Sequence, residues 1–455
     1  MSQRARSLTA EMFHLAWPVL VAQLAVMANG VVDTVMAGRL GAIDLAAVGI
    51  GTSVYMTMFV AAMGVLLAVP PIVARLHGAG RHAEIGEEVR QSLWLALALG
   101  AAVILVLRHP EPLLALARLA PPVEAKVRAY LEALSWSVPA ALLFRVFYGF
   151  STGIGQPRPV MVLNLAGVAA KVPANAIFMY GGFGMPALGA PGCAVATSLV
   201  SWLLCLTAWG WSRANREYAG YALFARFSAP RWRILRQLLA LGVPIGATFL
   251  VDVTAFTMMA LFIARLGAAT SAAHQVAANV AVVLYMVPLS LGNAAGVLAA
   301  HALGGGDARR AQRAGRLGLA IGLALAFAAA GIVAAGASGI TALYTGDPGV
   351  AAIAAGLLPL VACYHLADAL QAVAINILRA YKKTTVPMLA YALTLWGVGL
   401  GGGYLLGLSN VFGAPRGAAG FWMGQIGGLA LAGIIVAGYF GRVASRSVRA
   451  SPTTV

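Results

Sequence analysis

The chain has 455 residues, of which 61% are hydrophobic and only 10% are charged. Soluble proteins carry roughly 25% charged residues, so this composition excludes a string of soluble domains. The 31 basic and 14 acidic residues give a net charge of +17. The basic residues fall in short loops between apolar runs, which argues against nucleic-acid binding, because that function needs them on one folded face. We therefore expect an all-α polytopic membrane protein.

Twelve apolar segments follow one another along the chain. Most reach the roughly 20 residues that a helix needs to cross the hydrocarbon core of a bilayer, and the third is short as its boundaries are drawn. The first is too long for the apolar core of a signal peptide and is interpreted as a retained helix. The predicted spans are 12–37, 46–74, 92–107, 129–153, 159–181, 190–211, 236–264, 271–300, 315–338, 349–378, 386–406 and 417–440.

The loops between these segments alternate in charge. One set is poor in charge except at 108–128, where the charges of Arg118 and three other basic residues are balanced in part by two acids. The other set is basic and includes the stretch from Arg213 to Arg236. Its remaining members are Arg4, Arg6, Arg75, Arg81, Arg90, Arg158, Arg309, Arg310, Arg313, Arg316, Arg379, Lys382, Lys383, Arg442, Arg446 and Arg449. Cytoplasmic loops are enriched in Lys and Arg, so both termini are predicted to be cytoplasmic.

The chain also repeats itself. One constant shift in numbering aligns LAWP at 15–18 with LGVP at 241–244, and RLGA at 39–42 with RLGA at 265–268; a slightly longer shift aligns Pro159 with Pro387. The repeat predicts two pseudo-symmetric six-helix bundles, 1–225 and 226–455, around a central cleft. The joint at 211–235 is basic and aromatic, and we interpret it as a linker anchored to anionic lipid. This architecture is typical of secondary transporters.

Three acidic residues, Asp33, Asp252 and Asp368, lie well inside predicted spans. A charge at bilayer depth costs about 2.5 kcal/mol or more, so such residues are functional candidates. Tyr364 and Gln371 share a helix face with Asp368. An acid surrounded by a phenol and amides either carries a proton or provides oxygens for Na⁺, and the sequence leaves both roles open.

Polar residues in other spans form two further groups. On the first predicted helix Asn29 lies one turn before Asp33, and on the eighth Gln275 and Asn279 share a face. On the fifth helix the candidates Asn164, Lys171 and Asn175 form one stripe. A lysine at this depth either loses its proton or pairs with a carboxylate. Asp33 is the obvious partner, so we predict that Lys171 contacts Asp33, within about 6 Å.

Motifs for other chemistries are missing. None of the four lysines follows a glycine, so the chain has no P-loop, and HExxH does not occur. We therefore expect no ATP-driven transport, no enzymatic activity and no cofactor apart from a transported Na⁺ or H⁺. The cysteines stand singly in apolar runs, which favours buried hydrophobic side chains over a metal or disulfide site; they are Cys193, Cys205 and Cys363.

Several longer motifs then point to a family. They include LAWPVLVAQ at 15–23, VDTVMAGRLGAIDLAAVGIG at 32–51, LHGAGR at 76–81, GQPRPVMVLN at 155–164, YGGFGMPALGAPGCAVAT at 180–197, LGVPIG at 241–246, AAHQVAANV at 272–280 and ILRAYKKTTVP at 377–387. From about residue 10 to 440 the chain resembles the multidrug and toxic compound extrusion (MATE) family, in its NorM branch. The resemblance implies a bacterial inner-membrane antiporter, expected to be monomeric, that exports hydrophobic organic cations against Na⁺ or H⁺.

The resemblance also assigns roles to residues. It places Asp33 on the family's first-helix acid and Asp368 on its tenth-helix acid, with Tyr364, Gln275 and Asn279 on polar positions around a C-lobe cation site. The chain departs from the family where Asp252 replaces the usual Glu, and where Lys171 and Asn175 replace the usual Asn-x3-Asn pair. The lysine near Asp33 argues against a cation site in the N-lobe and favours the C-lobe acids Asp252 and Asp368 as the coupling site, including a site for Na⁺.

Other functions fit less well. A flippase for a lipid-linked headgroup, within the same superfamily of folds, would need a cleft rich in arginine for phosphates. Acids inside the spans outnumber such arginines, which favours cationic drugs as cargo. A channel or receptor does not explain the duplicated lobes.

Overall fold

The computed structural model describes residues 7–112, 114, 119–182 and 184–450, so Arg4, Arg6 and Arg118 of the predicted loops lie outside the described residues. Within these ranges the chain is helical without a named strand, and Gly182 and Met185 form an isolated β-bridge. Eleven described helices are long and apolar enough to span a membrane, and a bent pair makes a twelfth. The prediction of an all-α membrane protein with twelve spans is confirmed.

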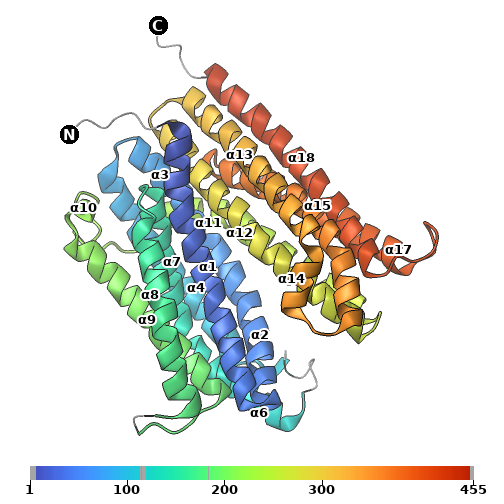
Figure 1. Cartoon of the computed structure of the whole chain (residues 1–455). Helices are drawn as coiled ribbons and strands as arrows, with labels where there is room; N and C mark the ends of the chain where they lie inside the picture. Colours follow the sequence, from blue (N-terminus) through green and yellow to red (C-terminus); the bar gives the residue numbers. More distant parts are fainter. Residues whose placement is uncertain (1–6, 113, 115–118, 183, 451–455) are drawn as a thin grey trace. The chain divides into compact units, whose positions relative to one another are not determined.

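The first half of the chain forms nine described helices (Figure 1). They are α1 (Leu8–Leu40), α2 (Ala42–Leu66), α3 (Val69–Gly78), α4 (His82–Arg108), α6 (Pro121–Ser135), α7 (Ser137–Gly153), α8 (Arg158–Tyr180), α9 (Ala190–Ala214) and α10 (Arg216–Ala219). The bent pair is α6 and α7, which meet at 42°. The third span was predicted too short. Helix α4 begins at His82, and its charged first turns, which lie before residue 92, are helical as well.

The second half forms helices at matching positions. They are α11 (Trp232–Ala264), α12 (Ala268–Gly304), α13 (Ala308–Ala335), α14 (Ala337–Tyr344), α15 (Pro348–Ala380), α16 (Thr385–Leu393), the π-helix η1 (Thr394–Gly401), α17 (Gly402–Leu408) and α18 (Ala418–Ala450). Arg379 was predicted in a cytoplasmic loop, which is wrong, because it lies in the last turn of α15. Arg90 likewise lies within α4.

The sequence repeat is also a repeat of turns. The shift that aligns the two RLGA motifs also aligns the start of α2 with that of α12, and the start of α4 with that of α13. Residues with a positive φ angle recur at the same or nearly the same shift. Glycine is favoured at such positions because it has no Cβ atom to clash with the backbone. The matching pairs are Gly41 with Gly267, Gly80 with Gly306, Gly155 with Lys382, and Gly189 with Gly417. Only the third pair replaces a glycine with a side chain.

The described chain forms two compact units, residues 21–246 and residues 1–20 with 247–455. Helices α1 and α11 therefore each contribute to both units, whereas the repeat placed the lobe boundary near residue 225, at the linker. In unit 21–246, α9 packs against α6, α7 and α8. In the other unit α15 contacts α12, α13, α14 and α18, and Figure 1 shows α13, α15 and α18 side by side.

Glycines allow close helix contacts in the unit that contains α15. A Cβ atom built on Gly296 of α12 would lie 2.8 Å from the carbonyl oxygen of Asn376 on α15. A second glycine contact joins α18 to the helix made of η1 and α17, where a Cβ on Gly424 would lie 2.3 Å from the backbone nitrogen of Gly403. Small residues let membrane helices approach at backbone distance, where van der Waals packing replaces the hydrophobic effect.

This contact predicts the effect of one methyl group. We expect Gly424→Ala to lower the melting temperature of the detergent-solubilised protein, because overpacking costs about 1–3 kcal/mol. Gly402→Ala is the matched control, since a Cβ there meets nothing within 4 Å. It should leave the melting temperature unchanged or raise it. Equal effects of the two substitutions would show that α18 does not need the close contact.

Candidate functional site

A cavity of about 330 Å³ lies within the unit that contains residues 247–455. Its walls come from α11, α12, α15 and α16. The polar side chains that line it are Thr248, Asp252, Thr257, Tyr285, Tyr364, Asp368, Gln371, Asn376, Arg379 and Tyr391. Two of the three predicted intramembrane acids, Asp252 and Asp368, therefore face one cavity.

The α15 wall follows helical periodicity. Tyr364, Asp368 and Gln371 share a face, as predicted, and all three line the cavity. The same stripe continues to Asn376 and Arg379, at spacings of three to five residues. With a rise of 1.5 Å per residue, the stripe from Tyr364 to Arg379 is about 22 Å long. One helix thus brings a phenol, a carboxylate, amides and a guanidinium to the same space.

Each carboxylate has a distinct setting. The hydroxyl of Tyr391, on α16, donates a 2.6 Å hydrogen bond to Oδ1 of Asp252 on α11. Asp368 is buried and lies on α15. Two ionised carboxylates in one buried space repel each other, so a bound proton or metal ion is favoured there. Carboxylate, phenol and amide oxygens are also the ligands that hard cations such as Na⁺ prefer.

Gln275 and Asn279 are placed elsewhere. They share a face of α12, as predicted, and the side-chain amide of Gln275 lies 3.5 Å from Oδ1 of Asn279. Neither belongs to the cavity lining, which α12 enters with Ala281, Val282 and Tyr285. Asn279 lies one turn and Gln275 two turns before Val282. Both are therefore on the same face of α12 as Val282, beyond the end of the cavity.

Arg379 is a lining residue that the sequence analysis missed. Its side chain is buried, the residue being 7% exposed, and Nη1 donates a 2.8 Å hydrogen bond to Oδ1 of Asn376. The guanidinium carbon lies 5.9 Å from the ring centre of Phe249. Its spacing of eleven residues from Asp368 corresponds to three helical turns and could have placed both on one face. Tyr285 and Tyr391 were missed because nothing in the sequence pairs them with α15.

The other unit contains a separate buried cluster. Nζ of Lys171 lies 3.2 Å from Oδ2 of Asp33, which confirms the predicted contact. Asn175 donates a 2.8 Å hydrogen bond to Oδ1 of Asp33, and Lys171 also bonds to the hydroxyl of Thr197. Lys171 is only 2% exposed. The ammonium group already neutralises Asp33, so another cation must displace it to bind there.

The remaining predicted residues of this half are outside the cluster. The side-chain amide of Asn164 donates to the carbonyl oxygen of Val160 at 2.8 Å, one turn earlier on α8. Oδ1 of Asn29 is buried and accepts no hydrogen bond from the described residues. No group of three or more His, Cys, Asp or Glu side chains suited to a metal ion occurs in the part of the chain that the structure describes.

The buried ion pair predicts a large stability effect. We expect Lys171→Met to destabilise the protein by about 3–5 kcal/mol, because it leaves Asp33, whose side chain is only 15% exposed, without its counter-ion. Adding Asp33→Asn should restore most of the loss. Thermal unfolding in detergent measures both effects. Arg81→Met is the control, since it breaks the exposed Arg81–Glu84 pair, for which about 1 kcal/mol or less is expected. Additive losses in the double variant would argue against a coupled pair.

Comparison with known proteins gives consistent matches over the whole chain. The MatE family model matches residues 18–177 and again residues 244–405. The second match follows the first at nearly the same shift as the aligned motifs, which confirms the internal repeat. Among solved structures, a MATE protein in the bent conformation superposes with a TM-score of 0.89 at 17% identity, covering 98% of both chains. The eukaryotic MATE transporter AtDTX14 gives 0.87 at 16% identity, covering 97% of this chain and 98% of that one.

Curated relatives are closer in sequence. The probable multidrug resistance protein NorM of Aromatoleum aromaticum is 40% identical over 445 residues, which cover 97% of this chain and 95% of the relative. The multidrug resistance protein PmpM of Pseudomonas aeruginosa is 39% identical over 447 residues, covering 98% and 94%. The multidrug resistance protein MdtK of Yersinia pseudotuberculosis is 39% identical over 433 residues, covering 95% and 94%. By family model, sequence and fold, the chain belongs to the MatE family, the family of MATE transporters.

Proposed function

We propose that this protein is a multidrug exporter of hydrophobic organic cations. The observation that carries the proposal is the cavity, in which two carboxylates, Asp252 and Asp368, face an aromatic wall. The carboxylates attract a cation, and rings such as Phe249 and Phe256 accommodate its apolar parts and its charge. The names of the relatives NorM, PmpM and MdtK, all multidrug resistance proteins, support the same function.

In this proposal the drug is exchanged for Na⁺ or H⁺. Asp252 and Asp368 bind the outgoing cation in one state and the incoming ion in the other. Only a difference in affinity between states can shift their populations, so competition for the same carboxylates couples the two fluxes. The hydrogen bond from Tyr391 orients Asp252 and stabilises its ionised form, which is the form that a cationic drug requires.

The exchange uses alternating access. The two repeats, 1–225 and 226–455, act as lobes that open a central cleft to one side of the membrane and then to the other. Asp33 has a fixed counter-ion in Lys171, so it serves structure more than coupling. We place the protein in the inner membrane of a bacterium, as a monomer with both termini in the cytoplasm. It acts without ATP, enzymatic chemistry or a resident cofactor.

A flippase for a lipid-linked headgroup is the second candidate, and Arg379 is the residue that favours it. Its guanidinium lines the cavity and would suit a phosphate. The lining contains this one guanidinium against two carboxylates, so the balance of charge favours a cationic cargo.

Transport in proteoliposomes tests the proposal. A fluorescent organic cation is loaded, and an inward Na⁺ gradient or an inward proton gradient is imposed separately. We expect one gradient to drive efflux, and Asp368→Asn to lower the rate by more than about tenfold, equivalent to about 1.4 kcal/mol. Asp33→Asn should have a mild effect on the transport rate per folded molecule, because Asp33 is not among the residues that line the cavity.

Two results would contradict this assignment. Loss of transport in Asp33→Asn with normal transport in Asp368→Asn would move the coupling site to the other unit. If neither gradient moves the dye, a flip assay with a labelled headgroup lipid should be made, and activity there would establish the flippase.

Tyr391→Phe tests the role of the hydroxyl. Without the donor the ionised form of Asp252 is less stable, so we expect Asp252 to hold a coupling proton more tightly and to bind Na⁺ or a cationic drug more weakly. A hydrogen bond to a charged group contributes about 1.5–3 kcal/mol, so the half-saturating concentration of the coupling ion should change by about tenfold or more, falling for H⁺ and rising for Na⁺. Tyr404→Phe is the control, as it changes an exposed tyrosine of the same unit outside the cavity lining. No difference between the variants would remove Tyr391 from the mechanism.

A further inference from the structure

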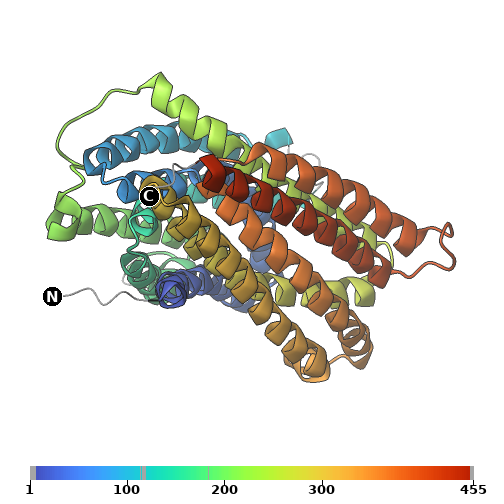
Figure 2. The same ribbon diagram turned by 90° about the horizontal axis from the view of Figure 1, so that it is seen from above.

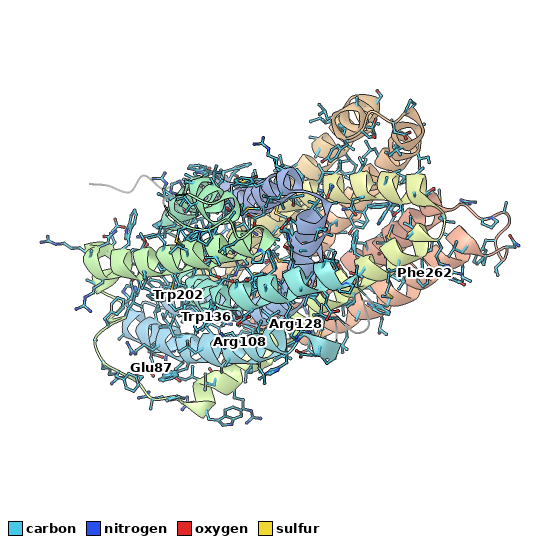
Figure 3. All side chains as sticks on the ribbon, turned by 90° about the horizontal axis from the view of Figure 1, so that it is seen from below. Glu87, Arg108, Arg128, Trp136, Trp202 and Phe262 are labelled. Carbon is cyan, nitrogen blue, oxygen red and sulfur yellow. The ribbon has the colours of Figure 1, made fainter. Side chains whose placement is uncertain are left out.

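The linker between α9 and α11, residues 215–231, has a fixed place relative to the membrane. Both flanking helices are candidate spans, so the segment that joins them lies at a membrane surface. Figure 2 shows the linker arching from α10 to the start of α11. Its contacts with α4, which carries Glu87 (labelled in Figure 3), lie within one compact unit.

Side chains of α4 hold the linker by hydrogen bonds. Glu87 is buried and accepts from the hydroxyl of Ser228 at 2.7 Å. Gln91 donates to the carbonyl oxygen of Ala229 at 2.9 Å and accepts from the backbone nitrogen of Arg231 at 2.7 Å. Trp94 donates to the carbonyl oxygen of Ser228 at 2.9 Å. Backbone groups outside helices need such partners, so this end of the linker is fixed on α4.

The other end of the linker is also held. Arg90 donates to the carbonyl oxygens of Ala222 and Leu223, at 2.7 and 3.2 Å. Tyr218, Tyr221 and Leu223 turn inward and are buried. The linker is therefore a docked strap with an inner face fixed to the protein.

Its outer face has aromatic and basic side chains. Phe227 is 83% exposed and Trp232, at the start of α11, is 69% exposed. The side chains of Arg226 and Arg231 beside them are 63% and 55% exposed. Aromatic rings with arginines are typical of the zone where a protein meets lipid headgroups. The strap thus presents these four side chains at the surface where the headgroups lie.

This face carries more positive charge than its acidic neighbours balance. Arg226 and Arg231 lie 3.5 and 3.6 Å from the carboxylate of Glu87, which already bonds to Arg90 at 2.9 Å. Three guanidinium groups therefore share one carboxylate. Over residues 211–236 there are six arginines and one acid, Glu217. The uncompensated charge attracts an anion, and the neighbouring exposed rings favour one with an apolar part.

We propose that Arg226, Phe227, Arg231 and Trp232 form a binding site for an anionic phospholipid of the adjacent leaflet. The two guanidinium groups bind the phosphate headgroup, and the two rings enter the interface between headgroup and acyl chain. The hydrogen bonds from α4 hold the strap in place, so the site exists before the lipid binds.

Native mass spectrometry of the full chain in neutral detergent tests the site. Phosphatidylglycerol, phosphatidylcholine or inorganic phosphate is titrated, and bound adducts are counted. We expect wild type to bind phosphatidylglycerol in preference to both others. Arg226→Gln with Arg231→Gln should weaken that binding by about 30-fold, from about fivefold for each basic residue at an anionic surface. Arg309→Gln with Arg313→Gln, which removes equal charge from exposed positions of α13, should bind as wild type.

Three outcomes would overturn the proposal. Equal weakening in the α13 control would mean that net charge attracts the lipid without a site. Equal binding of phosphatidylcholine would remove the role of the arginines, and equal binding of inorganic phosphate would remove the role of the rings. If the arginine variant melts at a lower temperature without lipid, Phe227→Ser with Trp232→Ser provides the second test. It changes only exposed rings and should also lose the preference for phosphatidylglycerol.

Discussion

A bilayer core provides no water, so every charge placed in it must be satisfied by the protein or by what the protein transports. This constraint shapes both buried polar sites. Asp33 is closed by its neighbours, with the ammonium group of Lys171 at 3.2 Å and the amide of Asn175 at 2.8 Å. Asp252 and Asp368 instead face a cavity of about 330 Å³. Asp33 thus has a counter-ion within the protein, whereas the cavity beside Asp252 and Asp368 leaves space for an ion that binds and is released.

The two repeats share a frame and differ in chemistry. Helix starts and left-handed turn residues recur at a nearly constant shift along the chain. The acids do not recur, because the shift that aligns the RLGA motifs places Met259 opposite Asp33 and Val26 opposite Asp252. Turn positions depend on backbone geometry, which any copy of the fold must keep. Polar side chains depend on the role of each half, and each unit has its own set.

Helix α15 gives the second unit its site, and close packing positions that helix. Gly296 of α12 lets the backbone of Asn376 approach, and the same stretch of α15 carries Arg379 into the cavity lining. At the membrane surface, side chains of α4 hold the strap, because they bond to backbone groups of the strap that no helix pairs. Its arginines and rings then face outward as a proposed lipid site.

The sequence alone determined the membrane class, the twelve spans, the repeat, the face shared by Tyr364, Asp368 and Gln371, and the pairing of Lys171 with Asp33. Charges are so scarce in apolar spans that Lys171 and Asp33, the one lysine and the one acid well inside the predicted spans of the first half, could be predicted to pair. Only the tertiary structure decided that Tyr391 bonds to Asp252, that Arg379 enters the cavity, and that Gln275 and Asn279 do not. Helical periodicity tells which residues share a face, whereas packing decides what another helix brings to that face and where the cavity ends.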